Sequence, residues 1–144
     1  MSSKSAKIEK LLAGHAGLPG FDRHYVGFFR CFNAQLYYEA HDVLEKVWLP
    51  IRGQAQARFY QGLIQMAGGF VHLQKHRLGP AARLFALALA NFEAYPAHHV
   101  GIDLDAIRQI CRDYRQAILD SHETLNPWSK DLAPQLALPT AGFA

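Results

Sequence analysis

The chain has 144 residues, of which 50% are hydrophobic and 19% are charged, with a formal net charge of +3. This composition excludes a disordered or fibrous protein and predicts one globular core. No window approaches the roughly 20 apolar residues that cross a bilayer, and the chain does not begin with the apolar segment of a secretory signal, so we expect no membrane partner and a cytoplasmic location.

Apolar residues recur at helical spacing along nearly the whole chain, and no segment alternates at period two for long enough to predict a strand. The sequence therefore predicts an all-α protein. We expect a compact bundle of about five helices with a long central helix, a short N-terminal helix and an extended C-terminal tail. We divide the chain into an N-terminal helix and linker (1–20), a helical core domain (21–123) and a proline-rich tail (124–144).

The N-terminal segment should carry a short helix over Ser5–Ala13, which ends in the stretch GHAGLPG. Ahead of Asp22 we expect the chain to be a tether. Asp22 is a good N-cap for a first core helix that ends at Asn33. The next helix, YYEAHDVLEKVW (37–48), should close before a proline and a glycine, because proline cannot continue the helical ladder.

The third core segment, about Gln54–His76, is the longest and is the predicted central helix. Gly79 and Pro80 then end it and open a fourth helix, because proline suits the first helical position. That fourth helix is rich in alanine and leucine and should stop before Pro96.

Asp103 is the predicted cap of a fifth helix that reaches about His122. Three arginines share one face of it and could meet phosphates, but acids lie among them, which favours a solvated face of mixed charge: Arg108, Arg112 and Arg115. Since lysine and arginine form no patch or tail elsewhere, the sequence does not favour a nucleic-acid partner.

Beyond the fifth helix the tail holds three prolines, so it should lie extended over the bundle or fray, with Trp128 as the expected anchor. Cys31 and Cys111 are 80 residues apart without the spacing of a zinc or redox motif. We interpret both cysteines as small buried hydrophobic residues rather than nucleophiles.

The helix over residues 37–48 mixes acids and a histidine with apolar residues. At 100° per residue, His41 and Glu45 lie together at the edge of its apolar arc, because they are four residues apart. Asp42 and Lys46 turn outward and are expected in water. Glu39 lies about 160° around the helix from His41, and its place in the early turns suits the helix dipole.

The long third helix carries a stripe of amide, glycine and imidazole side chains where a solvated face usually has lysine and glutamate. Within this helix, Gly68 and Gly69 each cost roughly 1 kcal/mol of helix stability against alanine. Close approach by another backbone or a ligand is a common compensation. We therefore hypothesise that the edge formed by His41 and Glu45 faces the stripe of the third helix, which contains Gln61, Gln65 and His72.

The motif FN-x-x-x-YYEAH-x-VLE-x-VW, followed after a break by FYQGLIQMAGGFVHL, resembles the domain of unknown function 309 family over about Phe29–Leu89. The resemblance implies a compact all-helical fold and, by name, a metal-dependent hydrolase. It carries over to these positions of the present chain: Glu39, His41, Glu45, Trp48, Gln61, Gly62, Gln65 and His72. The family's turn G-N-x-x-G-A departs here to HRLGPA, which places Arg77 at the asparagine position.

Three functions are open at this point. In a metal-dependent hydrolase, a divalent ion would be the cofactor, held by His41 and Glu45 with His72 as a third ligand. A water bound to it would be the nucleophile, with Glu45 or Glu39 as its base, so the catalytic candidates are Glu45, His41 and Glu39. There is no HExxH motif.

In a metal-free binding module, the same groups would orient a small molecule in a mostly apolar pocket. Its candidate ligand-binding residues are Gln61, Gln65, Trp48, Tyr38 and Tyr60. In a structural or interaction protein, the histidine, glutamate and glutamine set would only specify the fold. The sequence leaves open which of these applies, whether the protein is an enzyme, and its oligomeric state.

Overall fold

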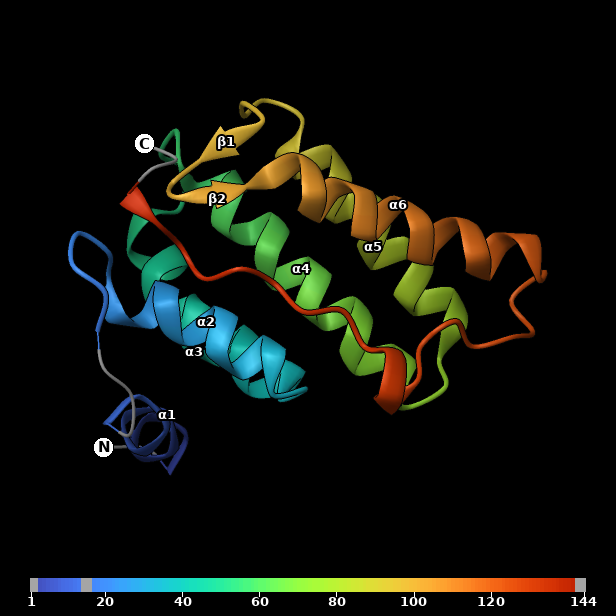
Figure 1. Ribbon diagram of the computed structural model, residues 1–144, viewed down its shortest axis with the longest axis horizontal. Helices are drawn as coiled ribbons and strands as arrows, with labels where there is room; N and C mark the ends of the chain where they lie inside the picture. The colour runs from blue at the N-terminus through green and yellow to red at the C-terminus, as the bar shows by residue number, and fades with distance from the viewer. Residues whose placement is uncertain (1–2, 14–16, 142–144) are drawn as a thin grey trace.

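The computed structural model describes residues 3–13 and 17–141, and Figure 1 shows a bundle of α-helices crossed by an extended C-terminal segment. The prediction of an all-α bundle is confirmed. The helices of the described ranges are α1 (Ser3–Ala13), α2 (Arg23–Asn33), α3 (Tyr37–Trp48), α4 (Ala57–Gln74), α5 (Leu78–Phe92) and α6 (Leu104–Asp120). Two short 3-10 turns, η1 (Leu49–Ile51) and η2 (Lys130–Leu132), follow α3 and α6. None of the described helices has the length and apolar character that crossing a bilayer requires.

The N-caps expected at Asp22 and Asp103 are present. The Asp22 carboxylate accepts a hydrogen bond from the backbone N–H of His24 at 2.7 Å, and the Asp103 carboxylate accepts one from Ala106 at 3.0 Å. Each satisfies an amide that has no partner inside its own helix. The starts of α2 and α6 were therefore readable from the sequence.

The ends of α4 and the start of α5 differ from the prediction. Residues 54–56 form a turn after Gly53, whose φ is +85°, so α4 begins at Ala57. At its other end the backbone of His76 takes a φ of 56°, which ends the helix before the predicted boundary. α5 begins at Leu78, two residues before Pro80, because the proline's missing N–H falls in the first turn, where amides have no helical partner.

A small hairpin was not predicted. Strands β1 (His98–His99) and β2 (Ile102–Asp103) pair antiparallel through a two-residue turn at Val100 and Gly101, both with positive φ. Two residues are too few for an alternating pattern to be visible in the sequence. Gly101 also has to be small, because a Cβ there would lie 2.5 Å from the ring of Phe21.

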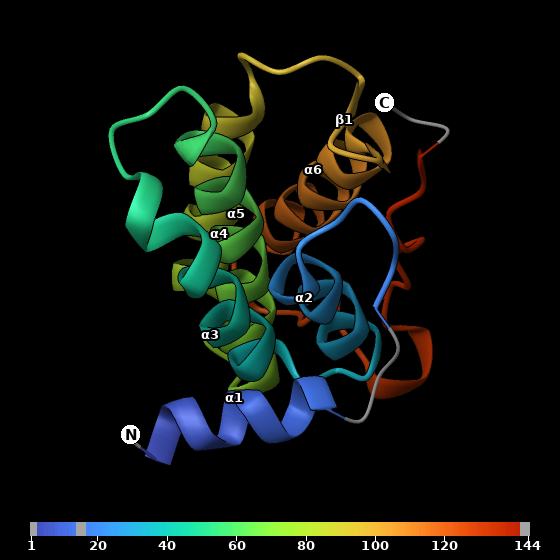
Figure 2. The same ribbon diagram turned by 90° about the vertical axis from the view of Figure 1, so that its left-hand side faces the viewer.

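The predicted central helix, α4, lies between α3 and α5 (Figure 2). Phe70, on α4, is fully buried and meets aromatic rings from four other helices at centroid distances of 4.9 to 5.3 Å. These rings are Phe32, Tyr37, Phe85 and Tyr114. Aromatic pairs of this kind add about 0.5–1.5 kcal/mol beyond the area they bury, so this turn of α4 is the centre of the core.

Glycines of α4 leave room for phenylalanine rings of α5. A Cβ at Gly62 would lie 2.5 Å from the ring of Phe92, and a Cβ at Gly69 would lie 2.7 Å from the ring of Phe85. The sequence predicted a close approach by a backbone or a ligand at Gly69. An aromatic side chain approaches it instead, so the cost of this helical glycine is offset by packing.

α1 packs on the bundle, so the expectation of a tether ahead of Asp22 is wrong for residues 3–13. Figure 2 shows α1 lying across α2 and α3. Ile8 and Leu12 are buried in the core, and Lys7 forms an ion pair with Glu39 at 2.8 Å. The apolar side of so short a helix gave no sign in the sequence of which surface it would cover.

The tail lies extended, running between α2 and α6 in Figure 1, rather than frayed. Trp128, the expected anchor, donates to the hydroxyl of Tyr37 at 3.1 Å. Asn33 is a second anchor, because its side chain exchanges two hydrogen bonds with the backbone of Leu136. The tail also contributes Leu136 to the core, so it is part of the folded unit.

Arg108 is not on a solvated face, which corrects that interpretation for one of the three arginines of α6. Its side chain is buried and donates to the carbonyls of Phe92 and Tyr95 and to the Asp105 carboxylate, at 2.5 to 2.6 Å. Phe92 ends α5, where carbonyls lack helical partners. Arg108 therefore secures the end of α5, and Arg112 is the neighbouring exposed arginine.

The interpretation of both cysteines as buried hydrophobic residues is confirmed. Burial raises the pKa of the Cys31 thiol to about 11 and that of Cys111 to about 12. The reactive form of a cysteine is the thiolate. These raised pKa values leave almost no thiolate at neutral pH.

We expect Gly69→Ala to lower the free energy of unfolding by about 1–3 kcal/mol, since the new methyl group overpacks against Phe85, despite the roughly 1 kcal/mol that alanine adds to helix stability. Gly68→Ala is the matched control: it gains the same propensity but meets only a terminal methyl of Leu84, at 3.1 Å. Urea denaturation of both variants checks this. Equal midpoints for the two would contradict the packing role of Gly69.

Candidate functional site

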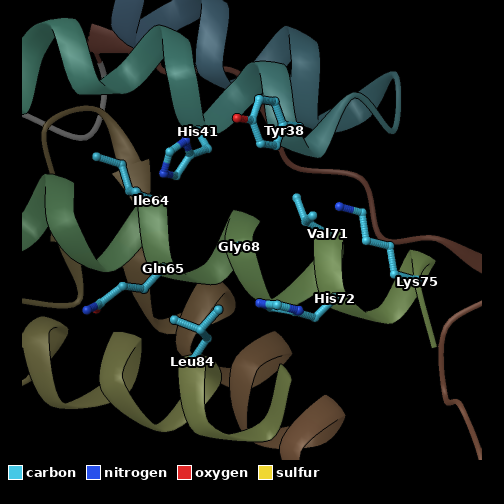
Figure 3. Close-up of a pocket in the computed structure, with 9 residues that line it drawn as sticks. All are labelled: Tyr38, His41, Ile64, Gln65, Gly68, Val71, His72, Lys75 and Leu84. Atoms are coloured by element: carbon cyan, nitrogen blue, oxygen red, sulfur yellow. The ribbon is translucent and has the colours of Figure 1, made fainter. Parts of the chain in front are cut away.

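A pocket of about 350 Å³ opens between α3, α4 and α5. Figure 3 shows α4 along its floor, with side chains from α3 on one side and from α5 on the other. Nine described residues line it: Tyr38, His41, Ile64, Gln65, Gly68, Val71, His72, Lys75 and Leu84. The aliphatic side chains and Tyr38 give it apolar walls, and hydrogen-bonding groups lie among them.

Helical spacing places the five lining residues of α4 in one stripe, and Lys75 follows directly after the helix. Successive members of this stripe are one or three residues apart: Ile64, Gln65, Gly68, Val71 and His72. Gly68 is in the middle of this stripe and leaves backbone exposed to the pocket. Because a Cβ at Gly68 would meet only Leu84, packing does not require a glycine there.

His41 lies between two carboxylates. Its Nδ1 is 3.1 Å from the Asp42 carboxylate, and its Nε2 is 3.1 Å from the Glu45 carboxylate, as the four-residue spacing predicts for the second pair. The prediction that Asp42 is in water is wrong: only 6% of it is exposed. α1 lies against α3 on the side of Glu39 and Asp42, where the sequence analysis expected solvent.

This arrangement constrains the protons. A neutral imidazole donates from one nitrogen only, and an ionised carboxylate can only accept. If Nδ1 donates to the buried Asp42, then Nε2 and Glu45 present two acceptors to each other at 3.1 Å. A proton or a cation between Nε2 and Glu45 resolves that conflict. In the tautomer that donates from Nδ1, Asp42 orients the ring and the side of His41 that faces Glu45 can take up a cation.

Several candidate residues lie away from the pocket lining. Glu39 is ion-paired with Lys7 of α1, on a different side of α3 from His41. Trp48 lies under the guanidinium of Arg52, at 5.9 Å from the ring centroid, and Tyr60 packs against other aromatic rings. Gln61 is half-buried and, like Glu45, does not line the pocket.

Gln65 is held by a residue that the sequence analysis missed. Its side-chain oxygen accepts a hydrogen bond from Asn91 of α5 at 2.6 Å, and the oxygen of Asn91 accepts one from Arg58 at 2.9 Å. Asn91 is buried. The signal that could have found it is one amide in the otherwise apolar run LFALALANF, because a buried amide needs partners.

His72 lines the pocket from α4, with its ring beside Gly68 and Leu84 in Figure 3. Its Nδ1 is buried and has no hydrogen-bond partner among the described residues. Burial lowers the pKa of His72 below the ordinary 6.5, and the positive charges of Arg77, Lys75 and Arg83 lower it further. Both effects favour the neutral form of the imidazole.

Metal-ligating side chains come together at one place in the described part of the chain, formed by His41, Asp42 and Glu45. Ligand atoms around a tetrahedral zinc ion lie about 3.4 Å apart, so the 3.1 Å between His41 Nε2 and Glu45 fits a chelating pair. Asp42 approaches the other ring nitrogen, which suits a residue that orients the ligand rather than a third ligand. His72 lies outside this group.

The comparisons with known proteins agree with the motif resemblance. Residues 25–84 match the family described as "Domain of unknown function (DUF309)", which confirms the resemblance. The uncharacterized protein YpuF of Bacillus subtilis (strain 168) is 24% identical over 115 residues, which cover 79% of this chain. The chain spans 65% of the length of that relative. All nine described lining residues fall within the matched segment.

We expect an NMR titration of the histidine ring protons to give His72 a pKa below 6.5. Between that value and 6.5 the unfolded state binds more protons, so His72 makes the protein less stable as pH falls through this window. Arg77→Gln should raise the pKa of His72 by removing a nearby positive charge, whereas Arg112→Gln on α6 should not. An unchanged pKa of His72 in Arg77→Gln would contradict the conclusion that the charge of Arg77 lowers it.

Proposed function

Starting from the family match over residues 25–84, we propose that this protein binds a small molecule in the pocket between α3, α4 and α5. The apolar body of the ligand would lie against Ile64, Val71 and Leu84, over the bare backbone of Gly68. The observation that carries this proposal is the combination of an apolar concave surface with hydrogen-bonding groups on the same few turns of helix.

The size of the pocket supports a small ligand. A volume of about 350 Å³ is at the lower end of the range for small-molecule sites. Roughly a dozen water molecules occupy that volume in the liquid. A ligand of about that many non-hydrogen atoms fits, which excludes a folded partner domain as the occupant of the pocket itself.

Gly68 supports an occupied pocket. A glycine inside a helix costs roughly 1 kcal/mol, and the structure explains Gly69 through Phe85 but gives Gly68 only a contact with the mobile end of Leu84. A ligand that lies against the backbone at Gly68 would account for the missing side chain. The same explanation was hypothesised from the sequence for both glycines, and it is now needed for Gly68 alone.

His72 supports a polar group on the ligand. His72 lines the pocket, and a neutral imidazole can offer a ligand one donor or one acceptor. On the other side of Gly68, Asn91 holds the oxygen of Gln65, which fixes the orientation of that amide. Polar atoms are therefore held in place at the pocket before any ligand arrives.

We expect Gly68→Leu to abolish binding of a neutral aromatic fragment such as phenylacetamide, because the new side chain fills the pocket floor. NMR amide shifts of residues 64–75 on titration with the fragment measure the binding. Ala90→Leu, which adds the same side chain at an exposed position of α5, should bind as the wild type does. Equal binding by Gly68→Leu would overturn the proposal, as would unchanged shifts in the wild-type protein with this fragment and with its charged analogues alike.

The second candidate is a metal-dependent hydrolase, and the pairing of His41 Nε2 with Glu45, with Asp42 on the other ring nitrogen, favours it. His41 and Glu45 would hold the ion, which would supply an activated water. Catalytic zinc takes three firm protein ligands, and the described residues bring together only two, since Asp42 faces the wrong nitrogen. The donor set therefore fits weak binding of a divalent ion better than a catalytic zinc centre.

We expect elemental analysis of purified, tag-free protein to find well below one transition-metal ion per chain, because two protein ligands do not hold zinc firmly. Zinc, manganese or iron near one per chain, lost in His41→Ala and kept in Glu39→Gln, would favour the hydrolase instead. If His41→Ala fails to fold while Glu39→Gln folds, the cluster of His41, Asp42 and Glu45 stabilises the fold rather than binding a metal. Thermal unfolding of both variants separates these outcomes.

A further inference from the structure

The charges around the pocket are unevenly distributed. None of its nine described lining residues is acidic, whereas Lys75 and two histidines are among them. The acids Asp42 and Glu45 lie beyond the ring of His41, at the α3 side. The basic residues lie toward the end of α4 and the start of α5. The pocket thus has a basic end at His72 and Lys75.

Three cations surround that end. Three positive charges each lower the pKa of His72: those of Arg77, Lys75 and Arg83. Arg83 has an acid nearby, because Glu123 and Arg83 both lie within 4 Å of the position a Cβ would take at Gly79. Lys75 forms no ion pair with any described residue, and in Figure 3 its side chain extends beside Val71. Of the three cations, Lys75 is the one that lines the pocket, because Arg77 and Arg83 are not among its lining residues.

His72 can act together with Lys75. A neutral imidazole offers one N–H donor, and an ammonium offers three. Hydrogen bonds from such groups to an anionic oxygen are the stronger kind, since one partner is charged. Lys75 directly follows the last residue of α4, three residues after His72, and both residues line the pocket.

We propose that the ligand of this pocket is an apolar acid, with its aromatic or branched body over Gly68 and its anionic oxygens on His72 and Lys75. This inference rests on the proposed function, which requires only that a small molecule binds there. It adds the sign of the charge and the end of the pocket that binds it. A carboxylate and a phosphate monoester share this chemistry.

The test compares three probes with the same ring on the full chain: phenylacetate, phenylacetamide and phenyl phosphate. NMR titration at low salt gives each dissociation constant and, from the amide shifts, the place of binding. Phenylacetate should bind about two- to fivefold more tightly than phenylacetamide, which is the scale of one exposed charge interaction. Added salt should weaken the binding of phenylacetate and leave the binding of phenylacetamide unchanged.

Lys75→Gln should lose most of the preference for phenylacetate over phenylacetamide and keep the affinity for the amide. Lys130→Gln, which removes one positive charge from η2 in the tail, is the matched control and should keep the preference. A tighter complex with phenyl phosphate than with phenylacetate would assign the anion as a phosphate.

Each other outcome has a definite meaning. Equal binding of acid and amide, or a preference that survives Lys75→Gln, would overturn this inference and leave the proposed function intact. Binding of neither phenylacetate, phenylacetamide nor phenyl phosphate at residues 64–75 would overturn both. A preference lost equally in Lys75→Gln and Lys130→Gln would overturn the inference as well, because it would reflect net charge rather than this pocket.

Discussion

The packing of α5 on α4 depends on glycines that leave space for phenylalanine rings. Gly62 receives Phe92 and Gly69 receives Phe85, so both helices repeat the contact after seven residues while running in opposite directions. Phe70, beside Gly69, lies against rings from α2, α3, α5 and α6. Interiors are packed about as densely as crystals, so this turn of α4 constrains the positions of four other helices at once.

The pocket follows from the same arrangement. With α3 on one side of α4 and α5 on the other, one stripe of α4 is left uncovered between them. Adjacent glycines of α4 therefore have different environments: Gly69 faces the core and is filled by Phe85, whereas Gly68 faces the pocket. The stability lost at one glycine is offset by packing, and the stability lost at the other points to a function.

The polar residues were only partly accessible to sequence reasoning. Helical spacing correctly placed His41 beside Glu45. It also placed Gln65 and His72 on one stripe of the third core helix, and in the structure both residues line the same pocket as His41. It failed for Asp42, because α1 lies against that part of α3, and it missed Asn91, because the contact with Gln65 joins α4 to α5. Neither contact follows from the period of a single helix.

The sequence by itself determined the all-helical class, the N-caps at Asp22 and Asp103, and which residues share a face of each helix, because these depend on backbone geometry within a few residues. Only the tertiary structure decided that residues 3–13 and the tail pack on the bundle, that Arg108 is buried at the end of α5, and that His72 lies among cations. Those features depend on side chains far apart in the chain, and burial and charge at one helix are set by the helices packed against it.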